Sequence, residues 1–136
     1  MATIEDAARL ALAMPQVTEG LRFRHRTWYV ARTGFAWERP LSKADIKRFA
    51  PAKPPAGPIL ALATADMAER EAILATSSPA FFTIAHFRDY PAFLIALDAV
   101  GDDELREAIR DAWLAGAPEP LARAYLARPR RAVQGA

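Results

Sequence analysis

The sequence predicts an α+β domain, a two-layer sandwich in which an antiparallel sheet of about five strands is covered by helices on one face. Two observations predict this class. Segments with apolar residues at every third or fourth position, typical of helices, alternate along the chain with short strand-like segments. The strand-like segments are joined by short connections, and such strands pair antiparallel. The length of 136 residues matches the commonest size of one domain, which we place at residues 1–127.

An opening helix is expected at about residues 3–13. Thr3 and Asp6 have the spacing of a capping box, in which two side chains satisfy free backbone N–H groups at a helix start. Apolar side chains then recur at helical spacing. Pro15 lies just past the expected end, where a proline stops a helix because it lacks the backbone N–H.

Residues 22–39 change to the alternating pattern of strands. Aromatic and β-branched side chains, which favour strands, alternate here with smaller or polar residues. Thr33 and Gly34 supply the residues of a tight turn. Strands at 26–32 and 35–39 are therefore expected to form a hairpin.

A second capping box, formed by Ser42 and Asp45, opens a short helix, and the proline-rich residues 50–58 after it are expected to form an exposed loop. The later elements follow in order: a strand at 59–63, a helix at 67–75, paired strands at 81–84 and 92–97, a helix through Leu105 and Trp113, and a last helix through Leu121 and Tyr125. The expected order is thus α-β(3)-α-β(2)-α. Residues 128–136 show no periodicity and are expected to form a disordered basic tail.

The composition excludes several kinds of site. Cysteine is absent, so a disulfide, a thiolate metal site and a cysteine nucleophile cannot form. The serines and histidines match no catalytic motif and no metal-ligand spacing, and the glycines form no phosphate-binding loop. We therefore expect no enzyme activity, no cofactor and no metal. A start without signal-peptide features, and no apolar stretch long enough to span a bilayer, favour a cytoplasmic protein without membrane contact.

The net charge of +2 hides an uneven distribution along the chain. Residues 20–53 carry nine basic side chains against two acidic ones, a balance of +7. Residues 66–111 carry ten acidic side chains against four arginines, a balance of −6. Such a separation produces a local electric field that the total charge does not reveal.

The basic segment opens with three arginines at every second position, Arg22, Arg24 and Arg26. The residues between them are Phe23 and His25. On one continuous strand the three guanidinium groups would project from the same face. Guanidinium groups suit phosphate oxygens, and aromatic rings stack on bases, so one interpretation is a surface that follows a nucleic acid backbone. The other is an ordinary charged sheet face with its aromatic side chains in the core.

The short helix after Ser42 adds more basic side chains, because Lys43 and Lys47 lie one turn apart with Arg48 beside them. The residues expected to bind nucleic acid are therefore Arg22, Arg24, Arg26, Lys43, Lys47 and Arg48, and the tail would add Arg128, Arg130 and Arg131. About four phosphate contacts predict a log–log salt slope of roughly −3.6 on duplex DNA.

Several stretches together carry a family resemblance. They are residues 13–20 (AMPQVTEG), 35–41 (FAWERPL) and 81–87 (FFTIAHF), the last continued by RDYP at 88–91. In this order they resemble the MmcQ/YjbR family of small bacterial proteins. The resemblance implies a secretion-chaperone-like α+β fold and, from a double-wing arrangement, DNA binding; it implies no catalytic residues.

The sequence departs from the family pattern in one turn. Ala85 stands where the family usually has a proline before the histidine, and Asp89 where it has a glycine before the Tyr-Pro pair. His86 and Tyr90 lie beside these two positions and form a candidate ligand turn, but because of the departures no role is carried over to them from the family.

Three functions remain open. The first is a DNA-binding or nucleic-acid-associated module. The second is a protein-interaction or chaperone-like module that acts through its sheet face or as a homodimer, without catalysis. The third is a small-ligand protein or an enzyme that uses the turn of His86 and Tyr90, which requires a pocket at that turn.

Overall fold

The computed structural model describes residues 2–129, which form an α+β fold of five α-helices, one 3₁₀ turn and six strands. The predicted class is confirmed, with one strand more than expected. The helices are α1 (Ile4–Leu12), α2 (Lys43–Phe49), α3 (Met67–Thr76), α4 (Asp102–Gly116) and α5 (Glu119–Ala127), and the 3₁₀ turn is η1 (Ala85–Phe87). The strands are β1 (Val17–Arg22), β2 (His25–Val30), β3 (Thr33–Glu38), β4 (Ile59–Ala63), β5 (Phe81–Phe82) and β6 (Ala92–Ala96).

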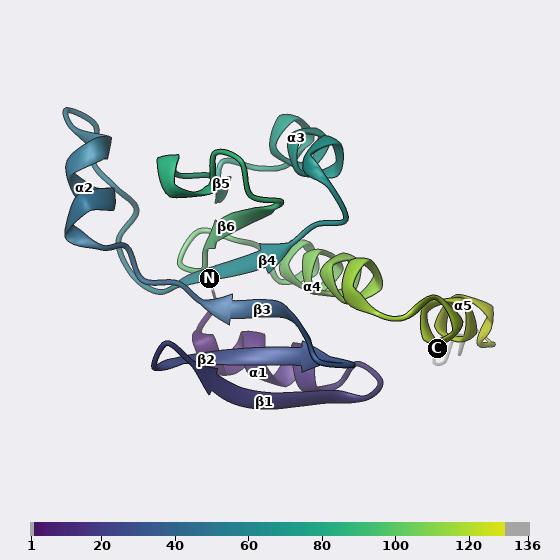
Figure 1. Cartoon of the computed structure of the whole chain (residues 1–136). Helices are drawn as coiled ribbons and strands as arrows, with labels where there is room; N and C mark the ends of the chain where they lie inside the picture. Colours follow the sequence, from purple (N-terminus) through teal and green to yellow (C-terminus); the bar gives the residue numbers. More distant parts are fainter. Residues whose placement is uncertain (1, 130–136) are drawn as a thin grey trace.

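The strands form one antiparallel sheet in the order β1-β2-β3-β4-β6-β5. Figure 1 shows α1 and α4 packed against the sheet, with α2 standing apart at one end. Both expected capping boxes are present: Thr3 accepts from the Asp6 N–H, and Ser42 accepts from the Asp45 N–H. None of the helices between residues 2 and 129 has the length and apolar character needed to cross a membrane.

The two faces of the sheet are covered to different extents. Leu60 and Leu62 of β4 join the larger core, which α1, α3 and α4 complete and in which Trp28 and Trp113 are fully buried. Their neighbours in β4 point the other way, into a smaller apolar cluster. That second face is covered by α2 and η1, which contribute Phe49 to this cluster among other side chains. One face is therefore closed by helices and the other is partly open.

The hairpin region differs from the prediction. The structure has two successive hairpins, with turns at Phe23–Arg24 and Ala31–Arg32, in which all four residues have positive φ, between 47° and 72°. This is the backbone of a two-residue type I′ turn, whose twist matches that of the strands. It normally requires Asn or Gly, and each other residue there costs about 1–2 kcal/mol. Thr33 and Gly34, expected in the turn, lie inside β3.

Candidate functional site

The turn at Phe23–Arg24 separates the three arginines that the sequence appears to align. Across β1 and β2, Arg22 is opposite His25 and Leu21 is opposite Arg26. Successive pairs in a ladder face opposite sides of the sheet, so Arg22 and Arg26 point away from each other. The prediction that Arg22, Arg24 and Arg26 share one face is therefore wrong, because the chain reverses direction between the first and the last of them.

Arg26 lies on the helix-covered face, where two carboxylates hold it. Its Nε donates to Oε2 of Glu19 at 2.8 Å and its Nη1 donates to Oε2 of Glu5 at 2.6 Å. The hydrogen bond from Arg26 lowers the pKa of Glu19, and the donor Nε1 of Trp28 lowers it further, against the opposing effect of burial. Arg26 is thus neutralised within the fold and is removed from the predicted binding set.

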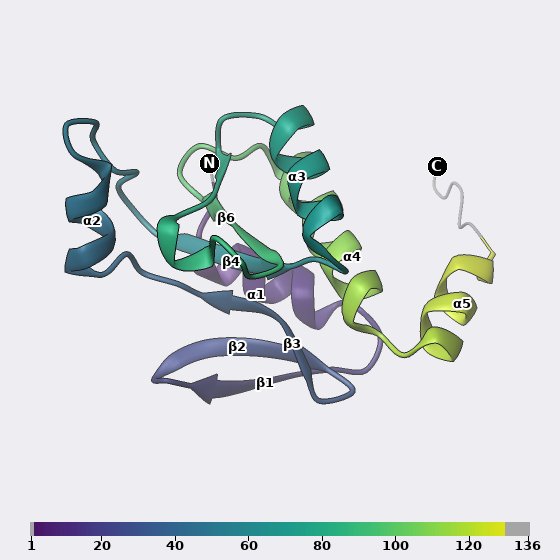
Figure 2. The same ribbon diagram turned by 45° about the horizontal axis from the view of Figure 1, so that its top comes forward.

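The other five basic residues of that set are exposed at one end of the molecule. Arg22 and Arg24 lie at the tip of the first hairpin, and Lys43, Lys47 and Arg48 lie on α2. Within residues 2–129 none of the five forms an ion pair. The hairpin tip and α2 lie at the same end in the views of Figure 1 and Figure 2.

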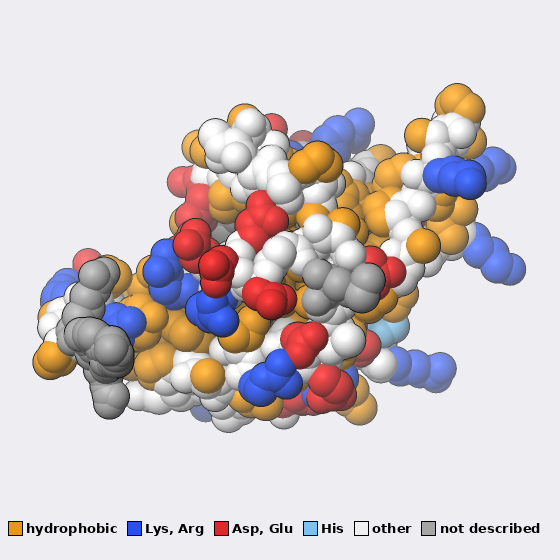
Figure 3. All heavy atoms as spheres, turned by 180° about the vertical axis from the view of Figure 1, so that it is seen from behind, with side chains coloured by type: hydrophobic (Ala, Val, Ile, Leu, Met, Phe, Trp, Pro, Cys, Tyr) orange, Lys and Arg blue, Asp and Glu red, His pale blue; other side chains and the backbone are white. Residues whose placement is uncertain are grey.

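The acidic side chains gather elsewhere. Seen from behind in Figure 3, Asp and Glu side chains cluster over α4, while Lys and Arg side chains stand out along the end from which α2 projects. The charge separation in the sequence is thus kept in the folded molecule. We call the five exposed residues Arg22, Arg24, Lys43, Lys47 and Arg48 the basic end.

A groove of about 580 Å³ lies beside the basic end on the partly open face of the sheet, and Arg22 of the basic end lines it. It is lined by four segments of the chain: the tip of the first hairpin, β2 with β3, the connection to α2, and the turn at η1. The groove brings Arg22 and His25 together with His86 and Tyr90, two pairs that are far apart in the sequence. The pocket that the third hypothesis requires at His86 and Tyr90 is therefore present.

Aromatic rings make up much of this groove. The Trp37 ring lies 6.4 Å from that of Tyr90 at an interplanar angle of 72°, and 6.4 Å from that of Phe87. The Arg22 guanidinium lies 5.8 Å from the Trp37 ring centre, in the range of a cation–π contact. Tyr90 is 46% exposed and Phe23, at the hairpin tip, is 86% exposed. Large apolar rings are thus presented to solvent between free cations.

The turn that carries His86 and Tyr90 is held in place by a buried arginine. Arg70 of α3 is 5% exposed, and its guanidinium donates to the backbone carbonyls of Phe87, Arg88 and Tyr90, the last at 3.1 Å. Arg70 was not predicted as a functional residue from the sequence. Its signal was a cation three residues after Met67, on the inward stripe of α3, where an apolar side chain is expected.

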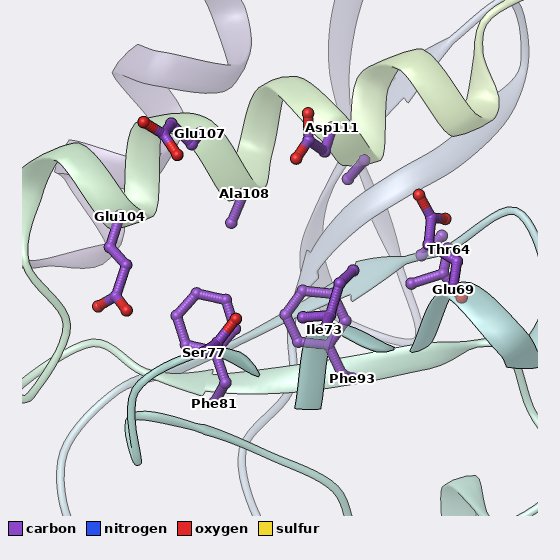
Figure 4. Close-up of a pocket in the computed structure, with 12 residues that line it drawn as sticks. Thr64, Glu69, Ile73, Ser77, Phe81, Phe93, Glu104, Glu107, Ala108 and Asp111 are labelled. Atoms are coloured by element: carbon purple, nitrogen blue, oxygen red, sulfur yellow. The ribbon is translucent and has the colours of Figure 1, made fainter. Parts of the chain in front are cut away.

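A second, smaller pocket lies between α3 and α4, with a volume of about 100 Å³. Figure 4 shows Glu104, Glu107 and Asp111 along α4 around this space, above the rings of Phe81 and Phe93. Carboxylates on its rim make it unsuitable for an anion. In the described part of the chain no group of three or more His, Asp or Glu side chains is arranged to hold a metal ion.

Comparison with known proteins gives relatives without an assigned activity. A family model described as YjbR matches residues 12–115. Two uncharacterized mycobacterial proteins, Rv2570 of Mycobacterium tuberculosis and Mb2600 of Mycobacterium bovis, are each 37% identical over 129 residues, covering 93% of this chain and 98% of theirs. The crystal structure of Deinococcus radiodurans DR2400, a DUF419 domain, has a TM-score of 0.60 at 17% identity, covering 100% of this chain and 96% of its own. This last likeness concerns the fold alone.

Proposed function

This chain belongs to the YjbR family, and from that premise and its surface charge we propose that it binds nucleic acid through the phosphate backbone. The observation that carries the proposal is the basic end, where five exposed cations lie together without ion pairs inside residues 2–129. Arginine and lysine bind phosphate oxygens, and the counterions that they release drive association. The acidic surface over α4 disfavours approach of a polyanion from the other side, so it orients the protein.

The affinity for DNA should then depend strongly on salt concentration. Each phosphate contact contributes about 0.9 to the log–log slope of affinity against salt concentration on duplex DNA. If all five residues of the basic end contact phosphates, the slope is about −4.5. The proposal names no side chain that reads a base edge, so we expect similar affinity for duplexes of different sequence.

The decisive measurement is fluorescence anisotropy of a labelled duplex at several salt concentrations. Charge reversal in the double variant Arg24→Glu/Lys47→Glu is expected to weaken binding at least about tenfold, and the single change Arg24→Gln is expected to reduce the slope by about 0.9. Arg32→Gln is the matched control, since Arg32 has the same place in the second turn at the opposite end of β2. Binding that is indifferent to salt, or equal losses for Arg24→Gln and Arg32→Gln, would rule out the proposal.

A protein-interaction or chaperone-like role is the second candidate, because the hairpin tip exposes apolar side chains. Leu21 is 73% and Phe23 is 86% exposed. A protein partner would bury these side chains, and a second copy of the chain would do so at high concentration. Sedimentation equilibrium of the protein and of Phe23→Asp tests self-association: a dimer that the substitution dissociates favours this role, and a monomer at all concentrations excludes the homodimer.

A further inference from the structure

We propose that the groove at the basic end takes an unpaired base, so that the preferred partner is single-stranded nucleic acid and not duplex. The inference deepens the proposed function and rests on it. It starts from the composition of the groove, which combines exposed rings with cations at its rim. Its volume of about 580 Å³ lies within the range of roughly 300–1,000 Å³ that is usual for sites that enclose a small ligand.

The rings supply the surfaces on which a base can stack. Phe23 stands at the hairpin tip with most of its surface exposed, and Tyr90 faces it from the turn at η1 with about half of its surface exposed. Trp37 lies between these two walls on β3 and contacts the Tyr90 ring edge to face. Stacking on aromatic side chains is tolerant of base identity, because every base has a π face.

The cations supply the contacts for the phosphates on either side of that base. Arg22 lines the groove from the hairpin tip, and Arg39, which pairs with Asp45 at 3.1 Å, lines it from the connection to α2. Arg24 and Lys43 are exposed and adjoin lining residues in the sequence, so each side of the groove carries basic groups. Glu38 also lines the groove, and a carboxylate there disfavours a phosphate inside, which leaves the interior to the uncharged base.

A duplex cannot use this arrangement fully. Its bases are stacked on each other and paired, so that only the phosphates and groove edges reach a protein surface. Flipping one base out costs a few kcal/mol, a cost that a single strand does not incur.

The test compares a single strand and a duplex of equal length, roughly ten nucleotides, a length within the site sizes known for such surfaces. The probes are oligothymidylate and a mixed-sequence duplex, titrated into the wild type and into Phe23→Ala, Tyr90→Ala and Leu21→Ala. Leu21 is the matched control, because it is another largely exposed apolar side chain on the same hairpin but faces the side of the sheet away from the groove. Thymidine monophosphate is titrated separately, to distinguish a free nucleotide from a nucleotide within a strand.

Intrinsic fluorescence gives a second readout. Of the three tryptophans, Trp28 and Trp113 are fully buried and Trp37 lines the groove. A stacked base is therefore expected to quench the Trp37 emission. The variant Trp37→Phe keeps a ring in the groove and should lose the quenching while it retains most of the affinity.

We expect oligothymidylate to bind more tightly than the duplex, and Phe23→Ala and Tyr90→Ala each to weaken it about tenfold. The same variants should leave duplex binding, thermal stability and the salt slope unchanged, and Leu21→Ala should change nothing. Equal affinity for both probes, or equal losses on both, would overturn the inference and leave the proposed function standing. Monophosphate binding as tight as that of the strand would overturn it too. If neither the single strand nor the duplex binds, both this inference and the proposed function are wrong.

Discussion

The two ends of β2 share one backbone geometry and have different surroundings. Both end in a two-residue turn with positive φ, at Phe23–Arg24 and at Ala31–Arg32. The second turn lies beside the packed end of the core, where Gly116 of α4 approaches Thr33 and Phe35 so closely that an added Cβ would be 3.3–3.4 Å from them. The first turn projects into solvent beside the groove.

The comparison shows that an unfavourable turn does not by itself identify a site. Both turns lack the glycine or asparagine that their backbone favours, and both place an arginine second. Only the first combines an exposed ring, free cations and a groove. We therefore expect substitutions at the packed end of β2 to affect stability and those at the open end to affect nucleic acid binding. The substitutions below test this expectation, from the largest effect to the smallest.

Trp113→Ala is expected to have the largest effect, because it opens a cavity at the packed end. Trp113 is fully buried, contacts the Tyr125 ring at 5.0 Å and donates from Nε1 to the carbonyl of Pro15 at 3.0 Å. We expect a loss of about 3–5 kcal/mol in the free energy of unfolding, measured by urea denaturation. Leu126→Ala, at an exposed position, should change it by less than about 0.5 kcal/mol; equal effects would contradict the burial of Trp113.

Arg70→Met should affect both stability and recognition at the open end. The methionine fills similar space but leaves the carbonyls of Phe87 and Tyr90 without their buried donor, which costs about 2–3 kcal/mol. The turn that presents His86 and Tyr90 should then loosen, and single-strand affinity should fall while the salt slope stays constant. Glu71→Gln is the control, since Glu71 is the exposed partner of the same guanidinium. Unchanged stability of Arg70→Met would show that Arg70 does not hold the turn.

Replacing each turn by Asn-Gly sharpens the comparison most directly. Phe23→Asn/Arg24→Gly and Ala31→Asn/Arg32→Gly should each raise the free energy of unfolding by about 1–2 kcal/mol, because glycine removes the cost of a side chain at one left-handed position and asparagine tolerates the other. Only the first pair should weaken nucleic acid binding. A loss of binding with the second pair as well would erase the proposed difference between the two ends.

Acid should produce the smallest effect. The pKa of Glu19 is lowered in the folded protein, first by the hydrogen bond from Arg26 and then by that from Trp28, against burial. The stability that this carboxylate contributes is therefore complete above its ordinary pKa of 4.5 and is lost as the pH falls through the lowered value. Glu19→Gln should cost less than about 1 kcal/mol near neutral pH, and this cost should shrink as the pH falls below 4.5. If the stability difference between the wild type and Glu19→Gln grew on acidification, this would contradict a lowered pKa of Glu19 in the folded protein.

Most of the fold follows from the sequence because its signals are local. Capping boxes at Thr3 and Ser42, the proline-rich loop and the apolar stripe of α4 each depend on a few neighbouring residues. β1 could not be predicted in this way, because Gly20 and its polar neighbours have weak strand preference and gain it only by pairing with β2. The turns were misplaced for a related reason: strand pairing imposed type I′ turns on residues that do not favour them.

The candidate site was predictable in its composition but not in its geometry. Five of the six basic residues are exposed, on the first hairpin and on α2, which lie at the same end of the molecule. The neutralisation of Arg26 depends on Glu5, 21 residues away on another element, which no local pattern reveals. The approach of Tyr90 to Trp37 likewise depends on the fold of the whole sheet. Arg130 and Arg131 of the expected tail lie outside the described residues.

Because α2 is short, we expect the part of the basic end that it carries to have a low local stability. Seven residues are fewer than the roughly 12–15 that an isolated helix needs in water, so α2 depends on the Ser42–Asp45 box, on the Arg39–Asp45 ion pair at 3.1 Å and on the packing of Phe49 against Phe82. Its amide protons should therefore exchange with deuterium much faster than those of β4 and β6, through local opening that leaves Trp113 packed. A bound polyanion would slow that exchange. The ligand would then order Lys43, Lys47 and Arg48, the cations on α2 that attract it.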